Sequence, residues 1–208
     1  MCIRDRFSSG LDLKVAAAEG LDPSTVEQRM RAHFHGLIRA LRKCPLPTVA
    51  LVDGVAAGFG CDLALACDLR LCSDRARFGE IFVKRGLMPD GGGTWTLPRL
   101  VGLGRALELM FTGDMVEAAE AKAIGLANRV FPAAQMEAAS TDFLHSLAGG
   151  PPMVHRAVKA AVYNALESSF DEALEAEVHG QLKLLASQDF MEGVAAFLEK
   201  RPPAFKGE

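Results

Sequence analysis

The stretch Thr48-Val-Ala-Leu-Val-Asp-Gly-Val-Ala-Ala-Gly-Phe-Gly-Cys-Asp62 decides the fold of this chain. Its first five residues, Thr48–Val52, form a short apolar run typical of a buried strand. The glycine-rich turn that follows predicts a helix that begins at Gly58–Gly60, because glycine permits positive φ and close backbone approach. Such a helix would present its first free N–H groups to whatever lies in front of it. Beyond it, we expect a second strand, Leu69–Cys72, and another glycine turn, Met88-Pro-Asp-Gly-Gly-Gly-Thr-Trp95.

Each of these two turns carries a carboxylate, Asp62 in the first and Asp90 in the second. Free N–H donors stabilise an oxygen that gains negative charge, and carboxylates move protons, so the pattern predicts acid–base chemistry on a carbonyl compound. Two plainer interpretations stay open. Asp62 could only complement the dipole at a helix N-terminus, and Asp90 could only cap the helix that follows it.

The composition favours a cytoplasmic enzyme and disfavours several other classes. With 208 residues the chain is long enough to bury a full core. A net charge of -3 and a pI near 6.0 give no basic surface for nucleic acid. No apolar run reaches the roughly 20 residues that a membrane span needs. The five cysteines lack paired metal-ligand spacing, so we expect reduced thiols and no metal site.

The N-terminal third of the chain adds a helix and one more glycine turn, so that the first, second and third glycine turns along the chain are those at Gly10, Gly58–Gly60 and Gly91–Gly93. The charged segment Met1–Arg6 predicts neither a signal peptide nor a strand, and the turn lies in Phe7-Ser-Ser-Gly-Leu-Asp-Leu13. A helix is predicted from Pro23, capped by Ser24 or Thr25, to about Arg42, with one apolar stripe. His33 and His35 are two residues apart and would face different sides of it, which argues against a metal pair.

The C-terminal part of the chain changes character after Phe131. Before it, helices are predicted at 97–101 and 104–111, then a helix that stops at Gly125 and a strand through Val130. After it only helices are predicted, at 133–148, 151–166, 170–187 and 190–200, with Pro151 as the first residue of one of them. We therefore predict an α/β fold in which residues 1–131 form a core with a layered parallel sheet and residues 132–208 a helical appendage.

The separated motifs together resemble one family. The turn Phe7–Leu13, the run Gly54–Asp68, the segment Gly86–Gly102 and the C-terminal Phe190-Met-Glu-Gly-Val-Ala-Ala-Phe-Leu-Glu-Lys-Arg201 are similar, in this order, to the crotonase (enoyl-CoA hydratase/isomerase) superfamily. The resemblance implies a core of ββα turns stacked into a spiral, acyl-CoA thioester substrates, and homotrimers or hexamers. It implies no cofactor, because coenzyme A is part of the substrate.

The resemblance also implies binding residues. Two backbone N–H groups would hold the thioester oxygen, those of Leu11 and Phe59. Further residues are implied to contact coenzyme A or the acyl group. They are Ser9, Gly10 and Gly58 on the turns, Phe82, Trp95, Met110 and Phe111 in the acyl pocket, and Lys200, Arg201 and Lys206 at the phosphates. The phosphate contacts could cross a subunit boundary. A solvated basic tail and ordinary core packing are the plainer interpretations of the last two groups.

The acids decide between reactions. Hydratases of the family hold water with two glutamates, at the positions of Asp62 and Phe82, and Phe82 cannot move a proton. Hydration would therefore need Glu80 or Asp90 as a substitute. An acid at Asp90 resembles 1,2-epoxyphenylacetyl-CoA isomerases, and the pair of Asp62 and Asp90 resembles dienoyl-CoA isomerases. We hypothesise an enoyl-CoA isomerase in which Asp90 is the principal base and Asp62 is its partner acid or the group that orients it.

Two other classes of function stay open beside the isomerase. One is an enoyl-CoA hydratase, which is a lyase, and the other is a non-catalytic acyl-CoA-binding protein or an inactive fragment. Family members normally begin with further strands and turns before the position of Phe7, so the N-terminal part is expected to be missing. Which acyl group is used does not follow from the sequence.

Overall fold

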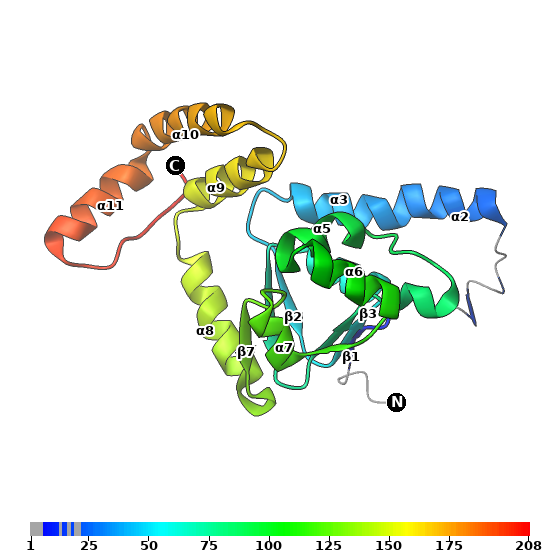
Figure 1. Ribbon diagram of the computed structural model, residues 1–208. Helices are drawn as coiled ribbons and strands as arrows, with labels where there is room; N and C mark the ends of the chain where they lie inside the picture. The colour runs from blue at the N-terminus through cyan, green and yellow to red at the C-terminus, as the bar shows by residue number, and fades with distance from the viewer. Residues whose placement is uncertain (1–5, 13, 16–17, 19–21) are drawn as a thin grey trace. The chain divides into compact units, whose positions relative to one another are not determined.

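The computed structural model describes residues 6–12, 14, 15, 18 and 22–208 (Figure 1). Within this part, the chain divides into two compact units. The first comprises the chain up to Cys44 and Thr48–Ser140, and the second comprises Pro45–Pro47 and Thr141–Glu208. The division falls inside helix α8, Met136–Ala148. Strands occur only up to Phe131 in the described residues, as the sequence predicts. The start of the chain, 1–5, and Leu13 of the first glycine turn lie outside the described residues.

The strands of the first unit form two sheets. One has the order β1 (Arg6–Ser8), β3 (Val55–Ala57), β5 (Arg77–Gly79) and β6 (Val116–Glu117), and the other has the order β2 (Val49–Val52), β4 (Leu69–Ser73) and β7 (Arg129–Phe131). All neighbours are parallel except β5 and β6, which are antiparallel. Each pass of the chain gives one strand to each sheet, β2 then β3 and β4 then β5, so successive passes stack as a spiral.

The predicted parallel core is therefore present, but as two sheets with an antiparallel edge. Gly54 lies between β2 and β3 with φ +99°, a backbone angle that favours glycine, and it turns the chain from one sheet into the other. The sequence predicts β2 and β4 as strands. It does not predict β1, β3, β5 and β6, because these strands of two or three residues give too short a pattern to show an alternation, and Arg6, expected outside any strand, begins β1.

Helices cover the sheets of the first unit. They are α4 (Phe59–Ala66), the 3-10 helix η3 (Ile81–Arg85), α5 (Gly93–Val101), α6 (Leu103–Thr112), α7 (Ala118–Ala123) and the 3-10 helix η4 (Ala133–Gln135). The helix predicted from Pro23 is present as α2 (Pro23–Arg29), the π-helix η2 (Met30–Phe34) and α3 (His35–Lys43). Its N-cap is Asp22 and not Ser24 or Thr25. The Asp22 carboxylate accepts from the backbone N–H groups of both residues, at 3.1 and 3.2 Å.

The core of the first unit lies between the strands and helices α4, α5 and α6. Its largest fully buried apolar side chains are Val52, Leu71, Phe78, Leu97, Val116 and Leu126. Each such side chain contributes about 1.5–3 kcal/mol when removed from water. Arg70 is also buried, and its guanidinium donates to the backbone oxygens of Leu126 at 2.6 Å and Cys67 at 2.8 Å. This bonding fixes β4 relative to the segments on either side of it.

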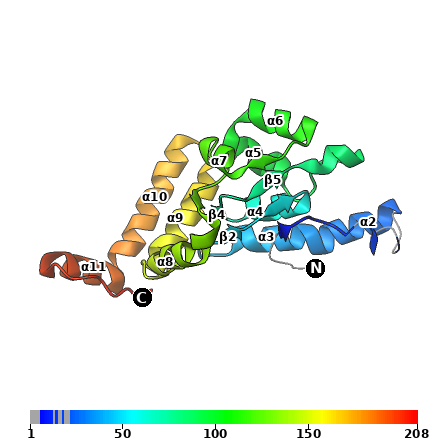
Figure 2. The same ribbon diagram turned by 90° about the horizontal axis from the view of Figure 1, so that it is seen from below.

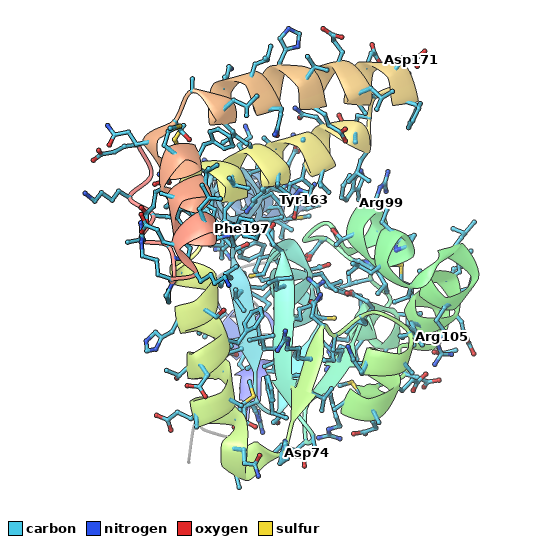
Figure 3. All side chains as sticks on the ribbon, turned by 90° about the vertical axis from the view of Figure 1, so that its left-hand side faces the viewer. Asp74, Arg99, Arg105, Tyr163, Asp171 and Phe197 are labelled. Carbon is cyan, nitrogen blue, oxygen red and sulfur yellow. The ribbon has the colours of Figure 1, made fainter. Side chains whose placement is uncertain are left out.

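The second unit is helical. It contains the end of α8, then α9 (Pro152–Ala165), α10 (Phe170–Leu185) and α11 (Gln188–Glu199), and α9 and α10 lie side by side in Figures 1 and 2. Pro151 is the N-cap of α9, and Pro152 takes the first helical position predicted for Pro151. Ser169 and Glu172 form a capping box at the start of α10. Many apolar side chains of this unit are exposed, among them Phe197, which is 83% exposed (Figure 3).

Candidate active site

The first glycine turn lies directly against the start of helix α4. Gly10 has φ +85°, and a Cβ built on it would lie 3.1 Å from the carbonyl oxygen of Ala57 and 3.2 Å from the backbone nitrogen of Phe59. Both the backbone angle and the space therefore favour glycine at this position. The turn brings the peptide that precedes Leu11 close to Phe59. Leu11 itself points outward, with half of its side chain exposed.

The second glycine turn opens α4 as predicted. Gly58 has φ +56°, and its N–H donates to the carbonyl oxygen of Gly79 at 2.9 Å, which holds the turn against the end of β5. Phe59 is the first residue of the helix, so its N–H has no partner inside the helix. A Cβ on Gly60 would overlap the carbonyl group of Ser8. Glycine at this position thus permits β1 to approach the helix start.

Asp62 lies one turn into α4 and is buried, with 1% of its surface exposed. Its Oδ2 atom accepts from the backbone N–H of Gly91 at 2.8 Å. Side chains at Gly91 or Gly93 would collide with the Asp62 carboxylate, so the glycines of the third turn permit this close approach. The Oδ1 atom has no hydrogen-bond partner among the described residues.

Glu80 brings a second buried carboxyl group to the same place. It follows strand β5, is 2% exposed, and neither of its carboxyl oxygens has a hydrogen-bond partner in the part of the chain that the structure describes. A Cβ on Gly93 would meet both Glu80 Oε1, at 3.1 Å, and Asp62 Oδ1. The two carboxyl groups therefore face the same small space around Gly93.

Asp90 is the third acid of this cluster. It is half-buried, and its Oδ1 atom is buried with no hydrogen-bond partner among the described residues. Its backbone carbonyl oxygen lies 2.9 Å from Nε2 of His35. The cluster of Asp62, Glu80 and Asp90 thus combines one half-buried acid with two buried ones.

Burial is the main cause of the electrostatics of the cluster. Together with the negative charge of Asp90 it raises the pKa of Asp62 to about 7, against the hydrogen bond from Gly91. Burial and the charges of Asp62 and Asp90 raise the pKa of Glu80 to about 8. Burial also raises the pKa of Asp90, and the neighbouring His35 opposes that rise. Near neutral pH the cluster therefore holds protons that exposed carboxyl groups would have lost.

The other predicted residues of the first unit lie near the turns or on helix surfaces. Ser9 is exposed beside Gly10. Phe82 is buried, and its ring tip lies 3.9 Å from where a Cβ of Gly58 would be. Trp95, predicted to line the acyl pocket, has the guanidinium groups of Arg42 and Arg99 over its ring, 4.2 and 3.9 Å from the centroid. These two arginine neighbours of Trp95 come from α3 and α5.

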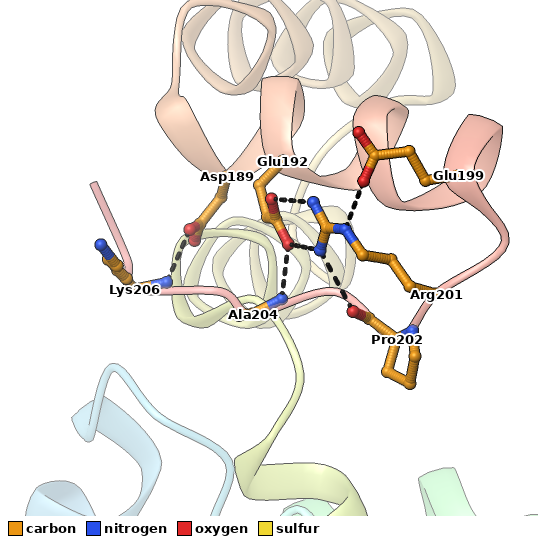
Figure 4. A network of polar contacts seen from close by, with 7 residues as sticks. All are labelled: Asp189, Glu192, Glu199, Arg201, Pro202, Ala204 and Lys206. Carbon is orange, nitrogen blue, oxygen red and sulfur yellow. Dashed lines mark hydrogen bonds and ion pairs between the residues drawn. The ribbon is translucent and has the colours of Figure 1, made fainter.

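The basic candidates Lys200 and Lys206 lie in the second unit. Lys200 ends α11 with φ +55°, and the backbone N–H of Lys206 donates to Asp189 at 2.7 Å (Figure 4). Both side chains are exposed. Arg201 is held by ion pairs to Glu192 and Glu199 (Figure 4), so its guanidinium is already engaged inside this unit.

Neither a metal cluster nor a membrane-spanning helix is present among the described residues. No group of three or more histidine, cysteine, aspartate or glutamate side chains there could hold a metal ion. None of the helices in that part of the chain is both long and apolar enough to cross a membrane.

The spiral of paired strands with its glycine turns defines a crotonase fold. An enoyl-CoA hydratase from Bacillus anthracis has a TM-score of 0.93 at 32% identity, over 100% of this chain and 79% of that one. A putative enoyl-CoA hydratase from Streptomyces coelicolor has a TM-score of 0.91 at 36% identity, over 98% and 74%. The predicted fold class is thereby confirmed.

The sequence gives the family. A model of the enoyl-CoA hydratase/isomerase family matches residues 3–208, and the chain belongs to this family. It is 43% identical to a probable enoyl-CoA hydratase of Rhodobacter capsulatus over 201 residues, which are 97% of this chain and 77% of that protein. It is 34% identical to the mitochondrial methylglutaconyl-CoA hydratase of Rattus norvegicus over 207 residues. The match to the rat protein covers 97% of this chain but only 64% of that relative, less than two thirds of its length.

Proposed function

We propose that this protein is an enoyl-CoA isomerase in which Asp90 removes a proton from the substrate and Asp62 is the partner acid. One observation carries the proposal: the peptide bond that follows Asp90 is hydrogen-bonded to Asp62. The N–H of this peptide belongs to Gly91 and donates to the Asp62 carboxylate. Phe82, at the position of the second hydratase glutamate, is apolar and buried. These acids fit proton transfer between two carbons better than the addition of water.

In the proposed reaction the backbone N–H groups of Leu11 and Phe59 bind the thioester oxygen. Asp90 takes a proton from carbon, and the electron pair of the broken C–H bond moves onto that oxygen as an enolate. The electrons then return to form the shifted double bond as Asp62 gives a proton to another carbon. The substrate gains and loses no atom overall, and proton exchange with solvent then returns Asp90 and Asp62 to their starting states. Removing one oxyanion donor from such a site typically costs about 2.7–4 kcal/mol of barrier.

The raised pKa values of the acids support these roles. A base is more effective when its pKa approaches the working pH, and burial raises the pKa of Asp90 in this direction. An acid must hold a proton in order to give one. With a pKa of about 7, Asp62 is protonated in a large fraction of molecules at neutral pH.

Hydration is the second candidate. It is favoured by the relatives, which are named as hydratases, and by Glu80, a second carboxyl group beside Asp62. Glu80 is almost as buried as Asp62, however, and neither of its carboxyl oxygens has a hydrogen-bond partner among the described residues, whereas Asp62 is bonded to the peptide next to Asp90. This arrangement supports Glu80 as a neighbour of Asp62 more than as a group that holds water.

Coenzyme A binding and assembly belong to the same proposal. The exposed ammonium groups of Lys200 and Lys206 suit the phosphates of coenzyme A. A homotrimer or hexamer would cover the exposed apolar side chains of α9, α10 and α11.

Isotope labelling tests the reaction. The protein is incubated in D2O with a panel of enoyl-CoA thioesters, and deuterium is located by mass spectrometry. Label at the α and γ carbons without added water supports an isomerase, and a water adduct supports a hydratase. Binding of the thioester without label would leave an acyl-CoA-binding protein and refute the proposed reaction.

Substitution of the base gives the matching test. We expect Asp90→Asn to slow labelling roughly 10²- to 10⁴-fold, the usual contribution of a general base. Asp114→Asn is the control, because Asp114 is an exposed aspartate of the same unit. Full isomerase turnover in the Asp90→Asn protein would remove the role of Asp90.

A further inference from the structure

Two consecutive residues of the N-terminal helix, Phe34 and His35, contact the proposed oxyanion residue and the proposed base. The ring of Phe34 lies 4.9 Å, centroid to centroid, from the ring of Phe59, whose N–H is a proposed oxyanion donor. Nε2 of the next residue, His35, lies 2.9 Å from the carbonyl oxygen of Asp90, the proposed base. One short segment thus contacts residues that belong to two different glycine turns.

This segment is an irregular part of the helix. Phe34 ends the five-residue π-helix η2, and His35 begins α3, with its backbone N–H bonded to the carbonyl oxygen of Met30. A π turn holds one residue more than an α turn, so it rotates all later side chains by about 100° around the helix axis. The π turn therefore determines which face of the helix carries the side chains of Phe34 and His35. π turns inside α-helices frequently occur at functional sites.

The His35 hydrogen bond fixes one side of the Asp90–Gly91 peptide. A carbonyl oxygen can only accept, so Nε2 of His35 must carry the hydrogen. The N–H of the same peptide unit belongs to Gly91 and donates to Asp62 Oδ2 at 2.8 Å. The peptide plane is therefore held at its C=O by His35 and at its N–H by Asp62. A fixed plane restricts the backbone of Asp90, from which the carboxyl group projects, and leaves that carboxyl group free to react.

We propose that His35 is a positioning residue for the base: together with Asp62 it clamps the Asp90–Gly91 peptide, and Phe34 on the same turn packs on the oxyanion residue Phe59. The π turn thereby sets the distance between the base and the oxyanion donors. This inference rests on the proposed roles of Asp90 and Phe59. The histidine does not contact the substrate in this role and exchanges no proton with it.

Three variants test the clamp in the full chain. His35→Leu removes the donor, His35→Gln keeps an amide N–H near the position of Nε2, and His33→Leu changes an exposed histidine two residues earlier. We expect His35→Leu to lower kcat roughly tenfold to hundredfold, because small misplacements of a reacting group have effects of this size. KM should change little, since binding of coenzyme A does not involve the clamp. His35→Gln should recover most of kcat, and His33→Leu should keep it.

The outcomes separate this inference from the proposed function. Unchanged kcat in His35→Leu, or no recovery in His35→Gln, would overturn the clamp even if the enzyme is an isomerase. If the unmodified protein labels no thioester, the proposed function fails. The clamp is then tested without substrate, by measuring hydrogen exchange of the backbone amides at residues 90–93. Faster exchange in His35→Leu than in His33→Leu then supports it, and equal exchange refutes it. If His35→Leu does not fold, His35→Asn replaces it, because its amide stops short of the carbonyl.

Discussion

Glu80 should make this protein less stable as the pH rises, and Glu80→Gln should remove that loss. In the folded chain, burial and the charges of Asp62 and Asp90 raise the pKa of Glu80 from 4.5 to about 8. In the unfolded chain, the carboxyl group returns to water and to its ordinary pKa. Glutamine has the shape of a protonated glutamic acid but does not titrate, so it replaces the group without the pH dependence.

The sign and size of the effect follow from these two pKa values. Below pH 4.5 Glu80 is protonated in both states and has no effect on the free energy of unfolding. Between pH 4.5 and about 8 the unfolded chain releases the proton while the folded chain keeps it, so stability falls as the pH rises. Above that window the loss is complete. At 1.36 kcal/mol for each pKa unit, Glu80 accounts for roughly 5 kcal/mol.

Urea unfolding between pH 4 and pH 9 measures this difference. Trp95 is the one tryptophan of the chain and lies on α5, in the same unit as Glu80, so its fluorescence reports on the relevant unit. The buried amide of Glu80→Gln adds an offset that does not vary with pH, so the slopes with pH are compared. Glu137→Gln, at an exposed glutamate of α8, is the control. Parallel curves for Glu80→Gln and the unmodified protein would refute the reasoning.

Two further substitutions test the glycine turns and the choice of reaction. Gly60→Ala should lower the free energy of unfolding by about 1–3 kcal/mol, because its Cβ would overlap the backbone of Ser8. Gly36 lies in α3 with open space around it, so Gly36→Ala should raise the free energy of unfolding by about 0.5–1 kcal/mol. Urea midpoints compare the two, and equal effects would contradict the close approach at Gly60. Phe82→Glu places an acid where the second hydratase glutamate lies, and we expect a water adduct of an enoyl-CoA thioester to appear by mass spectrometry. A folded Phe82→Glu protein that forms no adduct would count against this interpretation of Phe82.

The local pattern of the chain was enough to predict much of the scaffold. An apolar run followed by glycines predicts β2 and the start of α4 at Phe59, because apolar runs of this length form buried strands and glycine permits the turn. The same reasoning identifies Asp62 and Asp90 as candidate acids. It gives the wrong N-cap for α2, because Ser24 and Thr25 already lie inside the helix and the Asp22 carboxylate accepts from the N–H groups of both.

The environment of the acids could not be predicted in this way. Asp62 and Gly91 are 29 positions apart, and His35 and Asp90 are 55 positions apart. No local period connects them, because they meet only when successive passes of the chain stack.

What the sequence by itself determined is the family, strands β2, β4 and β7 with most of the helices, and Asp62 and Asp90 as candidate acids. What only the tertiary structure decided is which groups surround Asp62 and Asp90, namely Glu80 and His35, and how far burial raises the pKa values. The physical reason is that backbone preferences act over a few neighbouring residues, whereas burial and charge interactions depend on distances that the completed fold alone defines.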